Sequence, residues 1–297
     1  YRMQRNLVSV IMPTYNRKYI IQDAIDSCLE QSYKNIEVII CDDHSTDGTK
    51  QYIEERMKQD SRIKYCMTPN GKKGANAARN TAIKMAKGEF LTFLDSDDYL
   101  LPNSILDRVK LIQTNNVGMV YGDAIWQPVR GNKKIKIFFT DIRGEKLNQK
   151  KYLMQELSLC QQNTMMIRTS VFQKIGLLDE EQKGWTDDEV AVAVGMNYPI
   201  MHCKKIVAVV RSSEVSMVGN KWNMYLGCKK MVQRYKRQII QYVSIGRYIL
   251  WQIRLFSLYC LAKEREEALG SVRKKYWTNL HLITRKLIWP FFTNHFE

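Results

Sequence analysis

Short apolar runs alternate with amphipathic segments through the first hundred residues of the chain. The runs are almost continuously apolar, as in parallel strands buried on both faces, and they occupy residues 7–12, 36–41, 63–66 and 90–94. Between them, apolar residues recur at helical spacing in residues 19–31, 49–58 and 75–87, the last ended by Gly88. Pro102 is expected to open a further helix. This alternation predicts an α/β fold with a mostly parallel, Rossmann-like sheet and helices on both faces.

The pattern loosens after residue 121. Short strands are expected at residues 135–139, 164–167 and 206–210, and long helical patterns follow from residue 222, with breaks at Gly246 and Gly270. We therefore divide the chain into an α/β domain, residues 1–218, and a helical C-terminal extension, residues 219–297.

The composition is typical of a folded protein in a reducing compartment. The 297 residues are 45% hydrophobic, enough for a large core, which argues against disorder. The seven cysteines are an odd number without a Cys-x-x-Cys pair, so neither a disulfide framework nor a zinc site is expected. The first residues lack the apolar run of a signal peptide, and no uncharged run approaches the ~20 residues of a membrane span. We expect a cytoplasmic protein.

The positive charge is concentrated at the C-terminal end. The net charge is +16, and residues 220–297 hold 15 of the Lys and Arg residues against 4 Asp and Glu. Basic residues there alternate with aromatic and aliphatic ones, as in residues 229–237 and 287–292. This composition suits an anionic membrane surface, but it also fits nucleic acid binding or a solvated helix packed on the core.

Polar residues directly follow three of the predicted strands. They are residues 13–17, residues 42–43 and residues 95–98. In open parallel sheets, ligands bind outside the carboxyl ends of the strands, so we expect an aromatic ring and several carboxylates to share one crevice. The sequence has neither a Gly-x-Gly-x-x-Gly motif nor a Walker A loop, which removes the main support for a dinucleotide or P-loop site.

Asp95 and Asp97 are a candidate metal site. On an extended segment, residues two apart point the same way, and two adjacent carboxylates repel unless a cation lies between them. Mg²⁺ or Mn²⁺, held by one or two carboxylates and substrate phosphates, is the natural occupant. The alternative is that these aspartates form a turn or cap the helix near Pro102, and for Asp98 that alternative is at least as strong.

Four motifs in this order resemble the family 2 glycosyltransferases, which have the A-type nucleotide-sugar-binding fold. They are residues 8–17 (VSVIMPTYNR), 40–49 (ICDDHSTDGT), 74–80 (GANAARN) and 93–98 (FLDSDD). The resemblance is close over roughly the first hundred residues and extends weakly to residue 216. It implies that residues 1–115 bind a nucleotide-sugar and that residues 116–218 bind an acceptor.

The resemblance also implies roles for the residues at the strand ends. Tyr15 would stack near the base, Pro13 and Thr14 would shape its pocket, and Asp43 would accept a hydrogen bond from the imide N–H of uracil. UDP-sugar is therefore the expected donor class. Asn16 and Arg17 are interpreted as loop and helix-start residues.

The metal and the diphosphate would be held by the later motifs. Asp97 would be the direct metal ligand, Asp95 would lie near both metal and ribose, and Ser96 between them would line the donor site. Arg79 would approach the nucleotide or diphosphate. Its alternative role is an ion pair with Asp42 or Asp95, which is about equally well supported.

A carboxylate is needed to take the proton of the acceptor hydroxyl. The family's base lies in an acidic motif at the start of a late helix, and the matching segment here is residues 184–192 (GWTDDEVAV). Residues 176–180 (GLLDE) resemble the turn before it. The register favours Asp187 as the base, with Asp188 as the runner-up. The alternative is a helix N-terminus enriched in acids, which the helix dipole favours in any case.

Several other residues carry weaker hypotheses. Trp185 could pack on the acceptor sugar or be a buried loop aromatic, and His202 is expected to be structural. Contacts with sugar hydroxyls or phosphates are conceivable, on thin support, for Gln161, Gln162, Thr164 and Arg211.

The sequence thus predicts an inverting, Mn²⁺- or Mg²⁺-dependent glycosyltransferase that moves one sugar to a hydroxyl of a glycan or lipid-linked acceptor in polysaccharide biosynthesis. The Gln-x-x-Arg-Trp motif of processive, membrane-embedded synthases is missing. We therefore expect peripheral attachment at the inner face of the cell membrane and no nucleic acid partner, with self-association through the C-terminal helices left open. The competing hypotheses are a sugar-phosphate nucleotidyltransferase and a catalytically silent binding or scaffold protein on the same fold.

Overall fold

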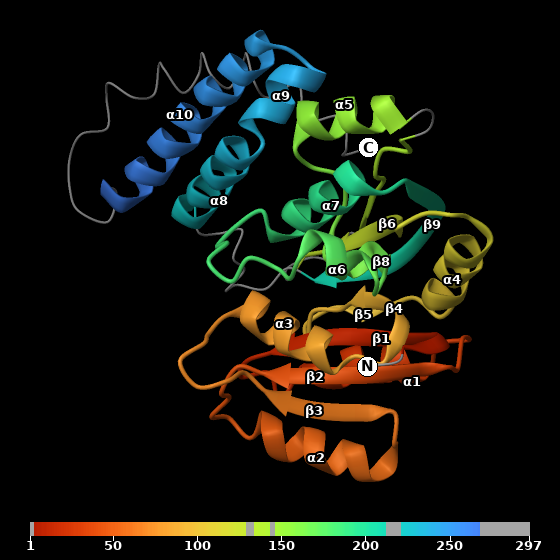
Figure 1. The fold of residues 1–297 in the computed structure, drawn as a ribbon. Helices are drawn as coiled ribbons and strands as arrows, with labels where there is room; N and C mark the ends of the chain where they lie inside the picture. Colours follow the sequence, from red (N-terminus) through yellow and green to blue (C-terminus); the bar gives the residue numbers. More distant parts are fainter. Residues whose placement is uncertain (1–2, 129–133, 143–145, 212–220, 268–297) are drawn as a thin grey trace.

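The computed structural model describes residues 3–128, 134–142, 146–211 and 221–267 (Figure 1). The strands are β1 (Gln4–Thr14), β2 (Ile36–Asp42), β3 (Ile63–Met67), β4 (Gly88–Phe93), β5 (Tyr99–Leu100), β6 (Met119–Gln127), β7 (Ile135–Ile137), β8 (Met165–Arg168) and β9 (Ile200–Arg211). The α-helices are α1 (Ile21–Leu29), α2 (Thr49–Gln59), α3 (Ala75–Met85), α4 (Ser104–Thr114), α5 (Lys146–Glu156), α6 (Val171–Ile175), α7 (Thr186–Asn197), α8 (Lys221–Arg234), α9 (Lys236–Tyr242) and α10 (Ile245–Glu267). A short 3-10 helix, η1, spans Gln162–Thr164.

In the described part of the chain, one nine-stranded sheet runs through the molecule in the order β3-β2-β1-β4-β8-β6-β9-β5, and β7 pairs with β6. The strands β3, β2, β1 and β4 are parallel, as are β6 and β9. The strand β8 enters antiparallel between β4 and β6 and joins the two halves of the sheet. The predicted α/β fold with a largely parallel sheet and helices on both faces is confirmed.

The central strand β1 shows why both faces must be covered. Val8, Val10 and Met12 belong to one buried cluster, together with apolar residues of α1 and α4. Ile11 points to the opposite face and belongs to a second cluster with residues of α3, α7 and α8. Because alternate residues of a strand face opposite sides, the continuous apolar run requires a helical layer on each side.

The strand β6 was not predicted, because Gly122 and Asp123 interrupt its apolar pattern. Both have a packing role. A Cβ on Gly122 would lie 2.7 Å from a methyl group of Val207 and 2.8 Å from the carbonyl oxygen of Lys205, so the glycine lets β9 approach. Asp123 is buried and accepts a hydrogen bond from His202 on β9 at 2.8 Å.

Three of the predicted helix boundaries, at Gly88, Pro102 and Gly246, were wrong. Gly88 does not end α3, which ends at Met85, but begins β4 instead. A Cβ at this position would lie 2.6 Å from Oγ of Ser9, so the glycine is needed for close strand packing. Pro102 lies two residues before the first residue of α4, and Gly246 lies inside α10, because the break between α9 and α10 falls at Val243 and Ser244.

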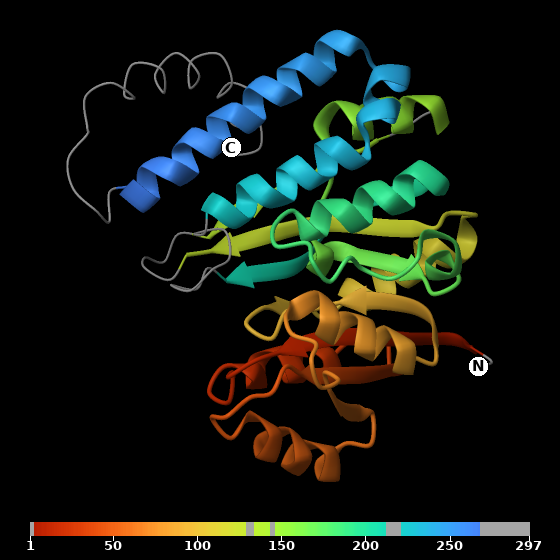
Figure 2. The same cartoon turned by 60° about the vertical axis from the view of Figure 1, so that its left-hand side comes forward.

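The C-terminal helices stack on the sheet side that carries α7. In Figures 1 and 2, α8 lies against α7 and α10 lies along the outer side of α8. No helix in the described ranges is long and apolar enough to cross a bilayer. Gly270 and the expected boundary between residues 218 and 219 lie outside the described residues.

Candidate active site

The carboxyl ends of β1, β2 and β4 meet at one edge of the sheet, as the motif positions predict. Thr14 pairs with Asp42 across β1 and β2, and Ile11 pairs with Phe93 across β1 and β4. The backbone N–H of Asp43 donates to the carbonyl oxygen of Thr14 at 2.8 Å. The polar residues that follow the three strands therefore lie together.

The first part of the site is a pair of buried oxygen atoms, on Asp43 and Thr14, that have no hydrogen-bond partner among the described residues. Asp43 accepts a hydrogen bond from the backbone N–H of Gly74 with Oδ2 at 2.7 Å. Its other oxygen, Oδ1, and the hydroxyl of Thr14 are buried without a partner among the described residues. Buried polar atoms are normally paired, so these atoms are suited to a ligand. Pro13 is buried beside them, whereas Tyr15 is 56% exposed and its ring is free to stack.

The neighbouring Asp42 has a different role. Its Oδ1 accepts hydrogen bonds from the backbone and hydroxyl of Ser45 at 2.8 and 2.6 Å, and its Oδ2 accepts one from the hydroxyl of Tyr65 at 3.2 Å. Asp42 thus holds the loop after β2, while Asp43 binds the backbone of Gly74 and keeps one oxygen without a partner in the described structure.

The loop that carries Asp95–Asp98 is held from two distant segments. The side chain of Asn163 accepts a hydrogen bond from the backbone N–H of Asp95 at 3.1 Å and donates one to Asp98. The backbone N–H of Arg211 donates to Asp98 Oδ1 at 2.7 Å. The N–H of Asp98 also donates to the carbonyl oxygen of Asp95 at 3.0 Å, so these aspartates form a turn, as one alternative held, and Asp98 is its buried anchor and not a helix cap. Burial and the nearby charge of Asp95 raise the pKa of Asp98 to about 8.

Asp95 and Asp97, in the same loop, are half-buried, in contrast to the buried Asp98. Burial first, and then the charge of Asp95, raise the pKa of Asp97. Two neighbouring carboxylates of this kind can serve as ligands of a divalent cation whose remaining ligands are phosphate oxygens. The described residues contain no group of three or more His, Cys, Asp or Glu that could hold a metal by itself. The site thus fits a cation that is shared with a ligand.

Two arginines, Arg17 and Arg211, reach the same loop. Arg17, interpreted from the sequence as a helix-start residue, lies with its guanidinium 3.5 Å from Asp97 Oδ2. Arg211 donates from Nε to the carbonyl oxygen of Asp97 at 2.5 Å, and its Nη2 is buried without a partner within the described ranges. Both cationic groups therefore lie beside Asp97, and Arg211 also forms an ion pair with Asp23 at 2.7 Å.

Arg79 meets Asp95 directly. Its Nη2 lies 2.6 Å from Asp95 Oδ1, and its Nη1 donates to the side-chain oxygen of Asn76 at 3.1 Å. The ion pair considered from the sequence is therefore present with Asp95 and not with Asp42. The Nε of Arg79 is buried and unpaired in the described structure. Ser96, the remaining donor-site candidate, is buried between the two aspartates.

The two candidate bases at the start of α7 differ in their surroundings. The desolvated site and the charge of Asp95 raise the pKa of Asp187 to about 7, although Arg79 opposes this shift. The pKa of Asp188 rises to about 6 through burial, and its Oδ1 already accepts a hydrogen bond from the hydroxyl of Ser158 at 2.7 Å. Asp187 therefore senses the Asp95 carboxylate, whereas Asp188 is tied to a neighbouring loop.

Other candidates are accounted for by packing. His202 is paired with Asp123 and stacks on Tyr121 with ring centroids 5.0 Å apart, so it is structural, as expected. Trp185 is half-buried and contacts Trp251 of α10 edge-on at 6.1 Å. The sequence did not predict the role of Asn163, although this residue lies between Gln162 and Thr164, which were candidates for contacts with sugar hydroxyls.

The chain matches the model of a known family over most of this α/β region. The family is glycosyl transferase family 2, and the match covers residues 9–176, more than half of the chain. This protein therefore belongs to glycosyl transferase family 2, and the resemblance seen in the sequence motifs is confirmed.

Curated relatives are glycosyltransferases. An uncharacterized glycosyltransferase of Haemophilus influenzae is 29% identical over 262 residues, which are 86% of this chain and 99% of the relative. A UDP-Glc:alpha-D-GlcNAc-diphosphoundecaprenol beta-1,3-glucosyltransferase of Escherichia coli, WfgD, is 44% identical over 121 residues. That match covers 41% of this chain and 47% of the relative, so the aligned part spans about half the length of the second protein.

Solved structures share the fold. The S. aureus protein TarS in complex with UDP-GlcNAc superposes with a TM-score of 0.62 at 22% identity, covering 88% of this chain and 72% of TarS. A mannosyltransferase of Pyrobaculum calidifontis in complex with GDP-Man and Mn²⁺ also has a TM-score of 0.62, at 18% identity, covering 99% of this chain and 83% of the other. At these identities the likeness establishes the shared fold.

Proposed function

We propose that this glycosyltransferase is an inverting, metal-dependent enzyme that moves one sugar from a UDP-sugar to a hydroxyl of a glycan or lipid-linked acceptor in polysaccharide biosynthesis. The observation that carries the proposal is that the carboxylates following β2 and β4 meet at one edge of the sheet, beside the end of β1, in a chain of glycosyl transferase family 2. Near them, the desolvated site and the charge of Asp95 raise the pKa of Asp187 to about 7. A carboxylate tuned in this way to neutral pH, next to a candidate diphosphate site, has the properties of a general base.

Recognition of the uridine is assigned to the residues at the ends of β1 and β2. The unpaired Oδ1 of Asp43 is an acceptor for the imide N–H of uracil, and the unpaired hydroxyl of Thr14 can bond to the same nucleoside. The exposed ring of Tyr15 offers a stacking face. Cytosine has no N–H at the equivalent ring position, so an aspartate there favours uracil.

The diphosphate is assigned to Asp95, Asp97 and the arginines around them. A Mn²⁺ or Mg²⁺ ion bound there would neutralise charge on the departing diphosphate. Arg17 and Arg211 lie against Asp97 and can bind phosphate oxygens, and Arg79 has an unpaired Nε in the same region. These groups would stabilise the charge that develops as the bond to the sugar breaks.

The transfer step is assigned to Asp187. Its carboxylate takes the proton of the acceptor hydroxyl while the oxygen attacks C1 of the donor sugar from the face opposite the diphosphate. The bond between C1 and the phosphate oxygen breaks, UDP departs with that electron pair, and the configuration at C1 is inverted. Asp188 is the less suitable base, because the hydroxyl of Ser158 occupies one of its oxygens.

The names of relatives suggest where the search for substrates should begin. WfgD is named as using UDP-Glc and a GlcNAc-diphosphoundecaprenol acceptor, and a Campylobacter jejuni relative, 36% identical over 154 residues, is named as a glucosyltransferase acting on an undecaprenol diphosphate glycan. We therefore propose UDP-glucose as the first donor to test and a lipid diphosphate sugar as the first acceptor.

A lipid-linked acceptor would place the enzyme at a membrane, and α10 has a suitable face. Ile245, Ile249, Ile253 and Phe256 recur at helical spacing and are between 47% and 65% exposed. The sequence between Lys221 and Lys263 contains no Asp or Glu. An exposed apolar stripe on an acid-free helical segment suits binding to anionic lipid headgroups.

The proposal is tested by measuring thermal shifts with UDP, GDP, CDP and dTDP in the presence of Mn²⁺, followed by turnover of UDP-glucose, UDP-galactose and UDP-GlcNAc with and without EDTA. UDP should give the largest stabilisation, since a ligand that binds the native state raises its apparent stability. Release of UDP should cease in EDTA and return with excess Mn²⁺. Full turnover in EDTA would exclude the metal role, and a preference for another nucleotide would exclude the assignment of Asp43.

A further inference from the structure

The segment that leads into α7 has a backbone conformation that needs outside support. Trp185, the residue before the helix, has φ = 60°, in the left-handed region that non-glycine residues rarely occupy. A non-glycine residue in this region is strained and persists where its surroundings hold it. Because Asp187 follows two residues later, whatever holds Trp185 also sets where Asp187 lies.

The backbone of α8 lies directly on this segment. A Cβ on Gly227 would fall far inside van der Waals contact with the carbonyl oxygen of Gly184, and a Cβ on Gly184 would lie 2.7 Å from the carbonyl oxygen of Asn223. The side-chain amide of Gln182 donates to both glycine carbonyls, at 2.7 Å for Gly184 and 3.2 Å for Gly227. Only glycine permits this approach of two backbones.

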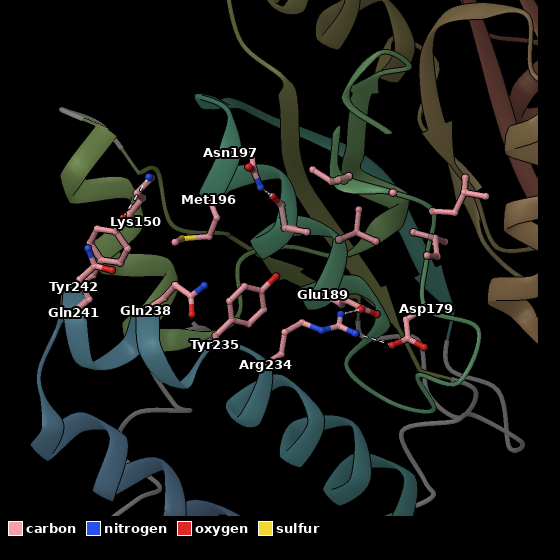
Figure 3. Close-up of a pocket in the computed structure, with 16 residues that line it drawn as sticks. Lys150, Asp179, Glu189, Met196, Asn197, Arg234, Tyr235, Gln238, Gln241 and Tyr242 are labelled. Carbon is pink, nitrogen blue, oxygen red and sulfur yellow. Dashed lines mark hydrogen bonds and ion pairs between the residues drawn. The ribbon is translucent and has the colours of Figure 1, made fainter. Parts of the chain in front are cut away.

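The same face of α8 also forms an ion pair with a residue in the first turn of α7. Arg234, two turns after Gly227, pairs with Glu189 and, at 2.7 Å, with Asp179 (Figure 3). The side chain of Glu189 is only 7% exposed, and it lies two residues after Asp187. Lys230 adds a second ion pair to Asp179 at 2.6 Å.

We infer that α8 is the positioning element of the catalytic carboxylate, with Gly227 and Arg234 as positioning residues for Asp187. This inference rests on the proposed role of Asp187 as the base. Gly227 fixes the backbone just before the base, and Arg234 fixes the side chain of Glu189 just after it. Thr14 and Asp43, the proposed uridine ligands, lie at the ends of β1 and β2. Gly227 and Arg234 lie on α8 and contact the residues on either side of Asp187, so their effects on turnover and on UDP binding can be measured separately.

The first test compares Gly227→Ala with Gly246→Ala. The added methyl group at Gly227 must push the Gly184 backbone away, whereas at Gly246 the nearest side-chain atom is 3.7 Å distant. Gly227→Ala should lower kcat with UDP-glucose and acceptor by about 10- to 100-fold, the loss typical of an ångström-scale misplacement, while the Kd for UDP stays within twofold. Gly246→Ala should leave both unchanged.

The second test does not depend on the fold tolerating a new methyl group. Arg234→Gln removes the cation that faces the buried carboxylate of Glu189, and Arg234→Lys keeps the charge. The glutamine variant should lose kcat without losing UDP affinity, and the lysine variant should recover part of it. Arg237→Gln, an exposed neighbour one residue into α9, is the control. Equal kcat in the glutamine variant and wild type would overturn the inference.

Asp187→Asn, measured in parallel, separates this inference from the proposed function. If Asp187→Asn abolishes turnover while Gly227→Ala and Arg234→Gln keep it, the positioning role is wrong and the base assignment stands. If Asp187→Asn keeps full turnover, the base assignment itself is wrong. A fall in UDP affinity parallel to the fall in kcat would show general unfolding and would also overturn the positioning role.

Discussion

The guanidinium of Arg79 lies 2.6 Å from the carboxylate of Asp95, and the two groups act in opposite directions on Asp187. The charge of Asp95 raises the pKa of Asp187, and the charge of Arg79 lowers it. The side chain of Arg79 is only 4% exposed, so its charge is poorly screened by solvent. Arg79 therefore forms the ion pair with Asp95 and also acts on the ionisation of Asp187, whereas its role at the nucleotide stays a prediction.

Replacing Arg79 by Gln should lower turnover at neutral pH. Without the cation, the pKa of Asp187 rises further, and a smaller fraction of the base is ionised at pH 7. We expect kcat at pH 7 to fall by about tenfold or more and to recover partly at pH 9, a steeper rise with pH than that of wild type, whose base is already about half ionised at pH 7. Lys84→Gln, an exposed change on the same helix, is the control. A uniform loss at all pH values would contradict this electrostatic role.

Replacing Asp43 by Asn should change nucleotide selectivity. The amide of Asn can donate a hydrogen bond to the ring nitrogen of cytosine, where the carboxylate can only accept one. We expect UDP affinity to fall by about tenfold, the value of one hydrogen bond to a charged group, and the preference for UDP over CDP to shrink or reverse. Calorimetric titration with both nucleotides in Mn²⁺ measures this. Unchanged selectivity would show that Asp43 does not read the base.

The unfolding free energy of the metal-free protein should depend on pH because of the raised pKa of Asp187. Its pKa is about 7 in the folded state, against about 3.9 for an ordinary aspartate. Between these values the folded state holds a proton that the unfolded state has lost, so this group's contribution to stability is present below about pH 4 and disappears as the pH rises through 7. Asp187→Asn removes the dependence.

Chemical denaturation in EDTA at pH 5 and pH 8 measures this effect. The gain in unfolding free energy of Asp187→Asn over wild type should be larger at pH 8. Asp60→Asn is a control of opposite sign, because the hydrogen bonds from Arg62 lower the pKa of Asp60 and its ionised form stabilises the fold. A gain that is independent of pH would mean that Asp187 has an ordinary pKa.

Much of the α/β region could be predicted because its pattern is local. The strands β1 to β4 are continuous apolar runs, and their polar ends follow at once in the sequence. Helix α5 could not be found in this way, because Gln149, Leu153 and Met154 are its only buried residues and its pattern is mostly polar. Strand β6 could not be predicted because Gly122 and Asp123 interrupt its apolar pattern. Both residues are explained by contacts with β9, which the local sequence does not reveal.

The site was predictable where a motif carries it and not where contacts span long distances. Asp43, Asp95 and Asp97 follow strands directly, and the structure brings them to one edge as expected. Asn163 and Arg211 hold the Asp95–Asp98 loop from 65 and 113 residues away from Asp98, through side-chain and backbone bonds that no local pattern encodes. The pairing of Arg234 with Glu189 is of the same kind.

The apolar stripe of α10 predicts binding to anionic vesicles. Ile249→Glu places a charge in a stripe that is 54% exposed at this position, and it should reduce co-sedimentation with phosphatidylglycerol vesicles by severalfold. Leu147→Glu, 59% exposed on α5, is the matched control and should bind as wild type does. Equal binding of both variants, or equal binding to neutral and anionic vesicles, would contradict the assignment of this α10 face to anionic lipid binding. A change in oligomeric state with Ile249→Glu would assign the face to self-association.

The central claim is that Asp187 is the base of a sugar transfer from UDP-sugar, and its most direct test is turnover by Asp187→Asn and Asp188→Asn. Release of UDP from the donor should fall about 100-fold or more for Asp187→Asn, the usual value of a general base, while its Kd for UDP with Mn²⁺ stays that of wild type. Asp188→Asn should retain most of the turnover. Wild-type turnover in Asp187→Asn, or loss confined to Asp188→Asn, would contradict the account.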